Sequence, residues 1–226
     1  MSLLALGIGS GDEVLVPSLT FVSTAHAVLY VGAKPVFVDV CEDTLCMDPA
    51  DMEKKITKKS KAIIPVHFGG HPVDLDVIHK IAVKHNLAVV EDASHACGSQ
   101  YKGRMIGGLS DLTCFSLHAV KNLATGDGGM VTTNDKKLAG TIKRLRWVGI
   151  NKDTWEREEL VFQKGYRQYG WYYEVTDLGY KYHMNDLAAA IGLVQLAKLP
   201  SANARRRRLA KRYDGKFRKL PWLKIP

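Results

Sequence analysis

The chain has 226 residues, of which 46% are hydrophobic and 24% are charged. A sequence of this length and hydrophobicity can bury a core, which excludes a chain that is disordered throughout. Lys and Arg outnumber Asp and Glu by 32 to 23, so the net charge is +9 and an anionic partner such as a nucleic acid has to be considered.

The predicted elements alternate along the first two thirds of the chain. Strands are predicted at 13–16, 35–40, 62–66, 87–90, 112–117 and 129–133, and helices at 21–31, 49–57, 74–85 and 136–147. The strands are apolar throughout instead of at every second residue, which is typical of strands buried on both faces. The pattern predicts an α/β domain with a mainly parallel sheet covered by helices on both faces.

The last third of the chain has a different composition. Residues 148–182 are rich in Trp, Tyr and Gly without periodicity, which indicates a packed loop or an interface. A helix is predicted at 185–199, and Pro200 is expected to end it. The basic stretch after Ser201 is predicted to form another helix.

The excess positive charge lies in this basic stretch. Residues 205–219 hold nine Lys and Arg and one acid, Asp214, whereas the rest of the chain has 23 cations and 22 acids. Only Tyr213 and Phe217 are available there for stacking on bases. We therefore interpret the stretch as a solvated helix face and expect no nucleic-acid partner, with a basic nucleic-acid-binding module as the less favoured alternative.

Other classes of protein are disfavoured by what the sequence lacks. The four cysteines form no C-x-x-C pair, which indicates neither a zinc knuckle nor a disulfide framework. His67 and His71 could ligate a metal, but without a third ligand at fixed spacing a loop beside the site is favoured. No apolar run is long enough to span a membrane, and the first residues do not resemble a signal peptide. We expect a cytoplasmic protein with no metal site and no membrane contact.

Two residues at predicted strand ends could carry chemistry. Ligands of open parallel sheets bind beyond the carboxyl ends of strands. Asp92 closes one apolar strand, where it is either a cap of the following turn or a functional acid. Lys121 follows another strand, and a lysine taken alone is usually solvated. Together, a lysine, an acid and nearby hydroxyls are the apparatus for Schiff-base chemistry on pyridoxal phosphate.

Several blocks of the sequence, in order, resemble the DegT-type nucleotide-sugar aminotransferases, which have the pyridoxal-phosphate fold type I. The blocks span nearly the whole chain and lie at 12–24, 32–39, 91–96, 116–123, 125–129 and 179–186. They read DEVLVPSLTFVST, GAKPVFVD, EDASHA, SLHAVKNL, TGDGG and GYKYHMND.

The resemblance implies a role for individual residues. Lys121 is implied to form the Schiff base with pyridoxal 5′-phosphate and to shuttle the proton, and Asp92 to pair with the pyridine nitrogen. Phe21 matches the aromatic residue that stacks on the cofactor ring, with ordinary core packing as the alternative. His95 matches a Gln or His near the ring hydroxyl, and Ser116 matches a hydroxyl that binds the cofactor phosphate.

Lys181 occupies a place where many members have an Asn that reaches the cofactor phosphate of the neighbouring subunit. A lysine could serve that phosphate as a point charge, and the alternative is a solvated surface lysine. Because the family builds each site from two chains, the resemblance implies a homodimer, with the aromatic tract that begins near Trp155 as interface material.

Family chains are longer than this one, and they carry an upstream Gly-Thr phosphate-binding turn. We therefore expect 1–199 to be the large cofactor-binding domain, incomplete at its N-terminus, and 200–226 to be the start of a small C-terminal domain. The implied activity is transfer of an amino group, typically from glutamate, to a keto group of a nucleotide-linked sugar, as in polysaccharide biosynthesis. A truncated or noncatalytic regulatory relative on the same fold is the alternative.

Overall fold

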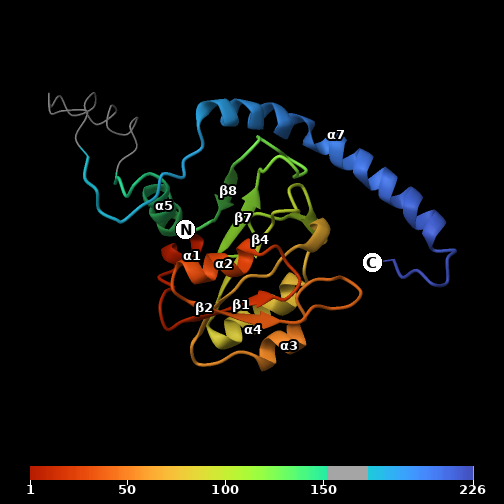
Figure 1. Ribbon diagram of the computed structural model, residues 1–226, viewed down its shortest axis with the longest axis horizontal. Helices are drawn as coiled ribbons and strands as arrows, with labels where there is room; N and C mark the ends of the chain where they lie inside the picture. Colours follow the sequence, from red (N-terminus) through yellow and green to blue (C-terminus); the bar gives the residue numbers. More distant parts are fainter. Residues whose placement is uncertain (152–172, 226) are drawn as a thin grey trace.

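The protein is described from a computed structural model that covers residues 1–151 and 173–225. Its centre is a six-stranded sheet in the order β2-β1-β3-β4-β7-β8, flanked by helices (Figure 1). The strands are β1 Glu13–Pro17, β2 Lys34–Val38, β3 Ser60–Ile63, β4 Ala88–Asp92, β7 Leu112–Ser116 and β8 Gly129–Thr132. All six lie within three residues of the strands that the sequence predicts, because apolar runs bounded by Gly, Pro and Asp are a strong strand signal.

The helices, with the exception of α1, also follow their sequence signals. Within residues 1–151 and 173–225 they are α1 Ser2–Ala5, α2 Ser23–Tyr30, α3 Pro49–Lys54, α4 Leu75–His85, α5 Lys136–Arg146 and α7 Asp186–Phe217, together with the 3-10 turn η1 at Phe68–Gly70. Four of them begin at an Asp or Asn whose side chain accepts a hydrogen bond from a backbone amide of the first turn: Asp48, Asp74, Asp135 and Asn185.

The sheet is mainly parallel, as the sequence predicts. β1, β2, β3, β4 and β7 pair in parallel, whereas β8 pairs antiparallel with β7. A parallel neighbour requires a crossover that carries the chain back to the starting edge, usually a helix. Residues 117–128 between β7 and β8 contain no helix, so the chain returns antiparallel and this loop lies at the carboxyl edge of the sheet.

Two hydrophobic layers enclose the sheet. On one face, Val14, Val16 and Val90 pack with residues of α1, α2 and α5 such as Val28 and Ile142. On the other face, strand residues pack with residues of α3 and α4, including Leu15, Ile63, Val89, Met52 and Ile78. Successive strand residues point to opposite faces, so neighbouring positions at the end of β4 also face different layers.

Three features differ from the predicted elements, the first being α1, a single helical turn at Ser2–Ala5 where no helix is predicted. α7 continues through Pro200, so the expected end of the helix there is wrong. Proline removes one backbone hydrogen bond, but the adjacent Leu199 is buried in a cluster with Leu117 and Leu123, and this packing holds the helix in place. A two-stranded hairpin, β5 Gln100–Tyr101 with β6 Arg104–Met105, is formed where no strands were expected, because such short strands carry no periodicity.

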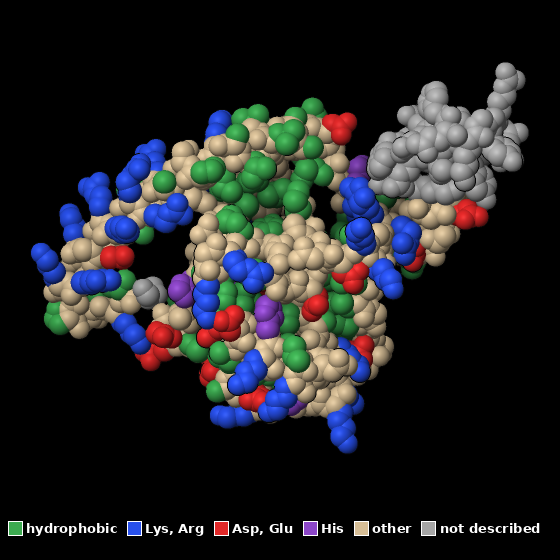
Figure 2. Space-filling view, turned by 180° about the vertical axis from the view of Figure 1, so that it is seen from behind, with side chains coloured by type: hydrophobic (Ala, Val, Ile, Leu, Met, Phe, Trp, Pro, Cys, Tyr) green, Lys and Arg blue, Asp and Glu red, His purple; other side chains and the backbone are tan. Residues whose placement is uncertain are grey.

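The basic residues of α7 are exposed along its outer half, as expected of a solvated helix face (Figure 2). The predicted domain division at 199/200 falls within this helix and stays a prediction. Most aromatic residues of the tract at 148–182, including Trp155, lie outside the described residues. Among the described residues, no helix has the length and hydropathy that a membrane span needs.

The packing of α4 gives a test of the fold with an internal control. Ile78 is fully buried in the core, whereas Val83 on the same helix is 82% exposed. Ile78→Ala should lower the free energy of unfolding by about 2–5 kcal/mol because it leaves a cavity, and Val83→Ala should change it by less than about 0.5 kcal/mol. Urea unfolding followed by circular dichroism measures both, and similar losses in the two variants would contradict this helix orientation.

Candidate functional site

The predicted site residues come from the carboxyl ends of neighbouring strands. Asp92 is the last residue of β4 and Ser116 the last of β7. Phe21 lies between the end of β1 and the start of α2, and Lys121 lies in the loop from β7 to β8. Because these strands are parallel, their ends meet at one edge of the sheet, where ligands of such folds bind.

Asp92 is held by hydrogen bonds to both of its carboxylate oxygens. Oδ1 accepts from the Ser94 amide at 3.0 Å, and Oδ2 accepts from the Thr24 hydroxyl at 3.0 Å. The Thr24 hydroxyl lies 2.8 Å from that of Thr20. Asp92 therefore caps the turn after β4 with one oxygen and turns the other toward α2. A cavity of about 280 Å³ adjoins Asp92, Thr24 and Ser94.

His95 is the electrostatic link between the acid and the lysine. Partial burial lowers the pKa of His95, the positive charge of Lys121 lowers it further, and the negative charge of Asp92 acts in the opposite direction. The imidazole Nδ1 accepts a hydrogen bond from the Gly69 amide at 3.3 Å. Lys121 and Asp92 are thus both close enough to His95 to influence its ionisation.

Phe21 and Ser116 lie at the same edge. The side chain of Phe21 is 74% exposed, so the alternative that it packs in the core is wrong. An exposed ring beside a polar site is available for stacking on a planar ligand. The Ser116 hydroxyl accepts a hydrogen bond from the His118 amide at 3.4 Å. Cys114 of β7 pairs with Asp92 of β4, and Ser116 lies two residues further along β7. Since side chains alternate along a strand, Ser116 and Asp92 point to the same face of the sheet.

Lys181 lies apart from this group. Its backbone pairs with Trp147 after α5, and its ammonium lies 3.6 Å from the centroid of the Trp147 ring. A cation over an indole face is attracted by the ring electrons. The described structure gives Lys181 a partner within its own chain, and its predicted contact with a phosphate stays a prediction.

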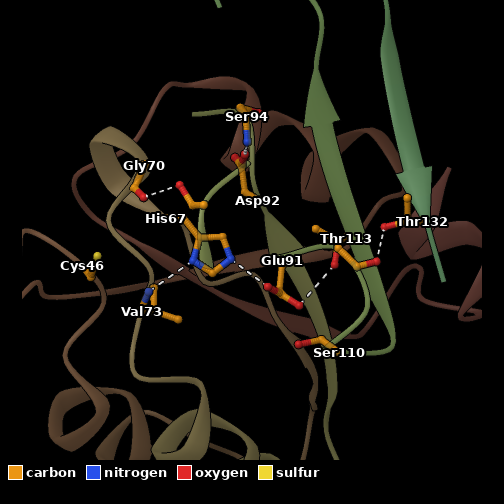
Figure 3. A network of polar contacts seen from close by, with 12 residues as sticks. Cys46, His67, Gly70, Val73, Glu91, Asp92, Ser94, Ser110, Thr113 and Thr132 are labelled. Carbon is orange, nitrogen blue, oxygen red and sulfur yellow. Dashed lines mark hydrogen bonds and ion pairs between the residues drawn. The ribbon is translucent and has the colours of Figure 1, made fainter. Parts of the chain in front are cut away.

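A buried pair of polar side chains, His67 and Glu91, lies beneath the site. The sequence did not predict that these two residues contact each other. Glu91 and His67 are fully buried, and their Oε2 and Nε2 atoms are 2.7 Å apart (Figure 3). Both nitrogens of His67 have hydrogen-bond partners, which supports the interpretation of this segment as a loop beside the site. Among the residues that the structure describes, no cluster of three or more potential ligands is placed to hold a metal. The signal for the pair was an acid inside an otherwise apolar strand.

Thr24 was also missed as a functional residue, although it lies in a block that carries the family resemblance. A threonine within a predicted helix has no distinguishing pattern, and only the tertiary structure brings its hydroxyl to Asp92, which is 68 residues away in sequence.

The donor set suits a phosphorylated aromatic aldehyde such as pyridoxal phosphate. A carboxylate, an imidazole, a primary amine and a hydroxyl gather at one sheet edge next to an exposed aromatic ring. A carboxylate can hold a pyridine nitrogen in its protonated form, and a lysine can condense with an aldehyde. The described residues therefore fit this cofactor.

Comparison with known proteins supports this chemistry. A model of the DegT/DnrJ/EryC1/StrS aminotransferase family matches residues 1–226. The chain belongs to this family. A curated relative is the spore coat polysaccharide biosynthesis protein SpsC of Bacillus subtilis, which is 48% identical over 227 residues; the match covers 100% of this chain and 56% of SpsC.

Solved structures of family proteins share the fold. DesV of S. venezuelae, determined in complex with a ketimine intermediate, has a TM-score of 0.85 and 38% identity, and the match covers 100% of this chain and 57% of DesV. The sugar aminotransferase Spr1654 of Streptococcus pneumoniae, described as putative and solved in its PLP form, has a TM-score of 0.83 and 34% identity. That match covers 95% of this chain and 56% of Spr1654. The fold is that of the large domain of pyridoxal-phosphate-dependent transferases, and the chain spans a little over half the length of these relatives.

The electrostatic coupling at the site predicts opposite effects of two substitutions on the pKa of His95. Lys121→Met removes a nearby cation and should raise this pKa, whereas Asp92→Asn removes a nearby anion and should lower it. NMR titration of the imidazole resonances measures both changes, with His95→Gln identifying the signal. Shifts in the same direction, or no shifts, would show that the three groups are not close.

Proposed function

We propose that this chain is the cofactor-binding part of a pyridoxal-phosphate-dependent aminotransferase that transfers an amino group to a keto group of a nucleotide-linked sugar. The observation that supports the proposal is that Asp92, which ends β4, and Lys121, which follows β7, each lie within electrostatic reach of His95. Membership of an aminotransferase family and similarity to Spr1654 in its PLP form support it.

Pyridoxal phosphate, when bound, supplies an aldehyde that carries the amine and a ring that withdraws electrons from the reacting carbon. Lys121 would hold the cofactor covalently and would take and return the proton at the reacting carbon. A primary amine on a flexible four-carbon stem is suited to both tasks.

Asp92 would accept a hydrogen bond from the protonated ring nitrogen. The hydrogen bonds from Ser94 and Thr24, one to each oxygen, keep the Asp92 carboxylate in one orientation. His95 would contact the ring hydroxyl, Phe21 would stack on the ring face, and Ser116 would bind the phosphate.

The amino donor and the sugar acceptor follow from the family. We propose glutamate as donor and a nucleotide-linked keto sugar as acceptor, in two successive half-reactions that share the cofactor. A role in polysaccharide biosynthesis is supported by the name of SpsC. We also propose a cytoplasmic homodimer, in which Lys181 leaves the Trp147 ring to serve the phosphate in the partner's site.

The nucleic-acid alternative is not favoured by the described residues. Tyr213 and Phe217 stack on each other along α7, with ring centroids 5.6 Å apart. A ring that is already stacked within the chain offers less of its surface to a base.

Covalent binding of the cofactor at Lys121 is the first test. Mixing the protein with pyridoxal phosphate should give an absorption band near the edge of the visible range, and borohydride should fix the label on the peptide that contains Lys121. Lys121→Ala should abolish both the band and the label, because no amine remains at that place. Lys137→Ala, which removes an exposed lysine of α5, is the control and should behave as wild type. Label in Lys121→Ala equal to wild type would contradict the assignment.

Amino transfer is tested separately by the first half-reaction. The protein loaded with pyridoxal phosphate should convert L-glutamate to 2-oxoglutarate, measured by coupled enzymatic assay, with D-glutamate as control. Lys121→Ala should lower the rate by about 10²–10⁴-fold, because positioned proton transfer contributes a factor of that order. A rate no higher than that of free pyridoxal phosphate would contradict an amino-transfer activity of this chain.

A further inference from the structure

We propose that the buried pair His67–Glu91 is a positioning device that holds His95 as a neutral imidazole with its proton on Nε2. His95 then offers a hydrogen-bond donor to the ring oxygen of the cofactor. This second step rests on the proposed function, whereas the first concerns only the chain itself.

The state of His67 follows from its partners. Its Nδ1 accepts a hydrogen bond from the Val73 amide at 3.2 Å, so the ring proton lies on Nε2 and is donated to Glu91 at 2.7 Å. His67 and Glu91 are fully buried, and Figure 3 shows the imidazole between Val73 and Glu91. A buried ring with both nitrogens engaged has one orientation.

Glu91 is an anion, and its side chain lies on the opposite face of the sheet from that of Asp92. Burial alone would raise the pKa of Glu91, but hydrogen bonds from His67, Ser110 and Thr113 outweigh it and hold the pKa below its ordinary value. The Thr113 hydroxyl donates to Oε1 at 3.2 Å. The carboxylate is therefore a fixed acceptor to which the His67 ring is anchored.

The pair anchors the turn η1, which begins one residue after His67. The His67 amide donates to the carbonyl of Asp92 at 3.1 Å, and the Gly70 amide donates to the carbonyl of His67 at 3.0 Å. The Gly70 carbonyl in turn accepts from the Ser99 hydroxyl at 2.8 Å. Hydrogen bonds thus hold one end of the turn to the last residue of β4 and the other end to the segment that follows β4.

This turn makes three contacts with His95. The Gly69 amide donates to Nδ1 at 3.3 Å, the Phe68 ring meets the imidazole edge-on at 6.2 Å between centroids, and Gly70 approaches the His95 backbone. A Cβ on Gly70 would lie 2.9 Å from the His95 carbonyl oxygen, closer than van der Waals contact allows. Only glycine permits this approach.

The consequence is a defined protonation of His95. A nitrogen that accepts a hydrogen bond carries no proton, so the proton of the neutral ring lies on Nε2. Protonation of Nδ1 would require breaking the hydrogen bond from the Gly69 amide. This bond therefore favours the neutral ring, as do partial burial and the charge of Lys121, whereas the charge of Asp92 favours the protonated ring. His95 is only partly buried, and its surface is accessible, so Nε2–H is open to a ligand at the site.

The test uses two variants: one removes the buried pair, and the other displaces the turn η1 that contacts His95. His67→Phe combined with Glu91→Leu replaces both buried partners by apolar groups, which avoids a lone buried charge. Gly70→Ala leaves the pair intact and pushes the turn away from His95. Gly103→Ala is the matched control, because Gly103 also has a positive φ, of +78°, but has open space where a Cβ would lie. Circular dichroism establishes that each variant is folded.

The first measurement is made without cofactor. ¹⁵N NMR of the imidazole gives the pKa of His95 and the nitrogen that carries its proton. In both disturbing variants the pKa should rise and the proton should distribute over both nitrogens, whereas Gly103→Ala should match wild type. Loss of the Glu91 charge by itself would lower the pKa, so a rise reports the lost hydrogen bond. If His95 keeps its wild-type pKa and tautomer in Gly70→Ala and in the double variant, the proposal is overturned.

The second measurement is the affinity for pyridoxal phosphate, followed by absorbance. Loss of one oriented donor should weaken binding by about tenfold in both variants. Unchanged affinity with an altered His95 would overturn the donor role of Nε2. Absence of binding in wild type would count against the proposed function and the donor role, while a changed His95 would still support the positioning of the ring.

Discussion

The site depends on one constraint, the alternation of side chains at the carboxyl end of β4. Glu91 and Asp92 are adjacent in sequence, yet they face opposite layers because successive strand residues point to opposite sides of a sheet. Asp92 meets Thr24 of α2, and Glu91 meets His67 in the core below. One strand end therefore supplies both an acid for the site and an anchor for the turn that supports it.

The buried carboxylate of Glu91 is tolerated because each of its oxygens has a hydrogen-bond donor. A carboxylate in a protein interior is destabilising unless hydrogen bonds replace its water. Glu91 has the ring of His67 and the hydroxyl of Thr113 as donors. The same arrangement also gives rigidity, because none of these side chains can rotate without leaving a polar atom unpaired. Rigidity beneath a site is useful where ligand groups must be held in one geometry.

The loop that carries Lys121 is held by hydrogen bonds from side chains to one backbone carbonyl, whereas Asp92 belongs to a strand of the sheet. Its neighbour Asn122 donates to the carbonyl of Cys97 at 2.6 Å, and Asn203 of α7 donates to the same carbonyl at 3.1 Å. The lysine loop, the segment after His95 and α7 are thus tied at one point. This accounts for the continuity of α7 past Pro200: the helix is held by tertiary contacts on both sides of the proline, including Leu199.

The sequence by itself determined the succession of the main strands and helices along the chain, the parallel character of most of the sheet and the family. Apolar runs and ordered motif blocks are local properties that survive without tertiary information. Only the tertiary structure decided that Thr24 reaches Asp92, that His67 pairs with Glu91, and that Lys181 lies on Trp147. The two residues of each contact are 68, 24 and 34 positions apart in the sequence, respectively. No pattern along the chain predicts a contact over such a separation. The physical reason is that burial and hydrogen bonding are settled by packing between elements, whereas periodicity reports only the elements themselves.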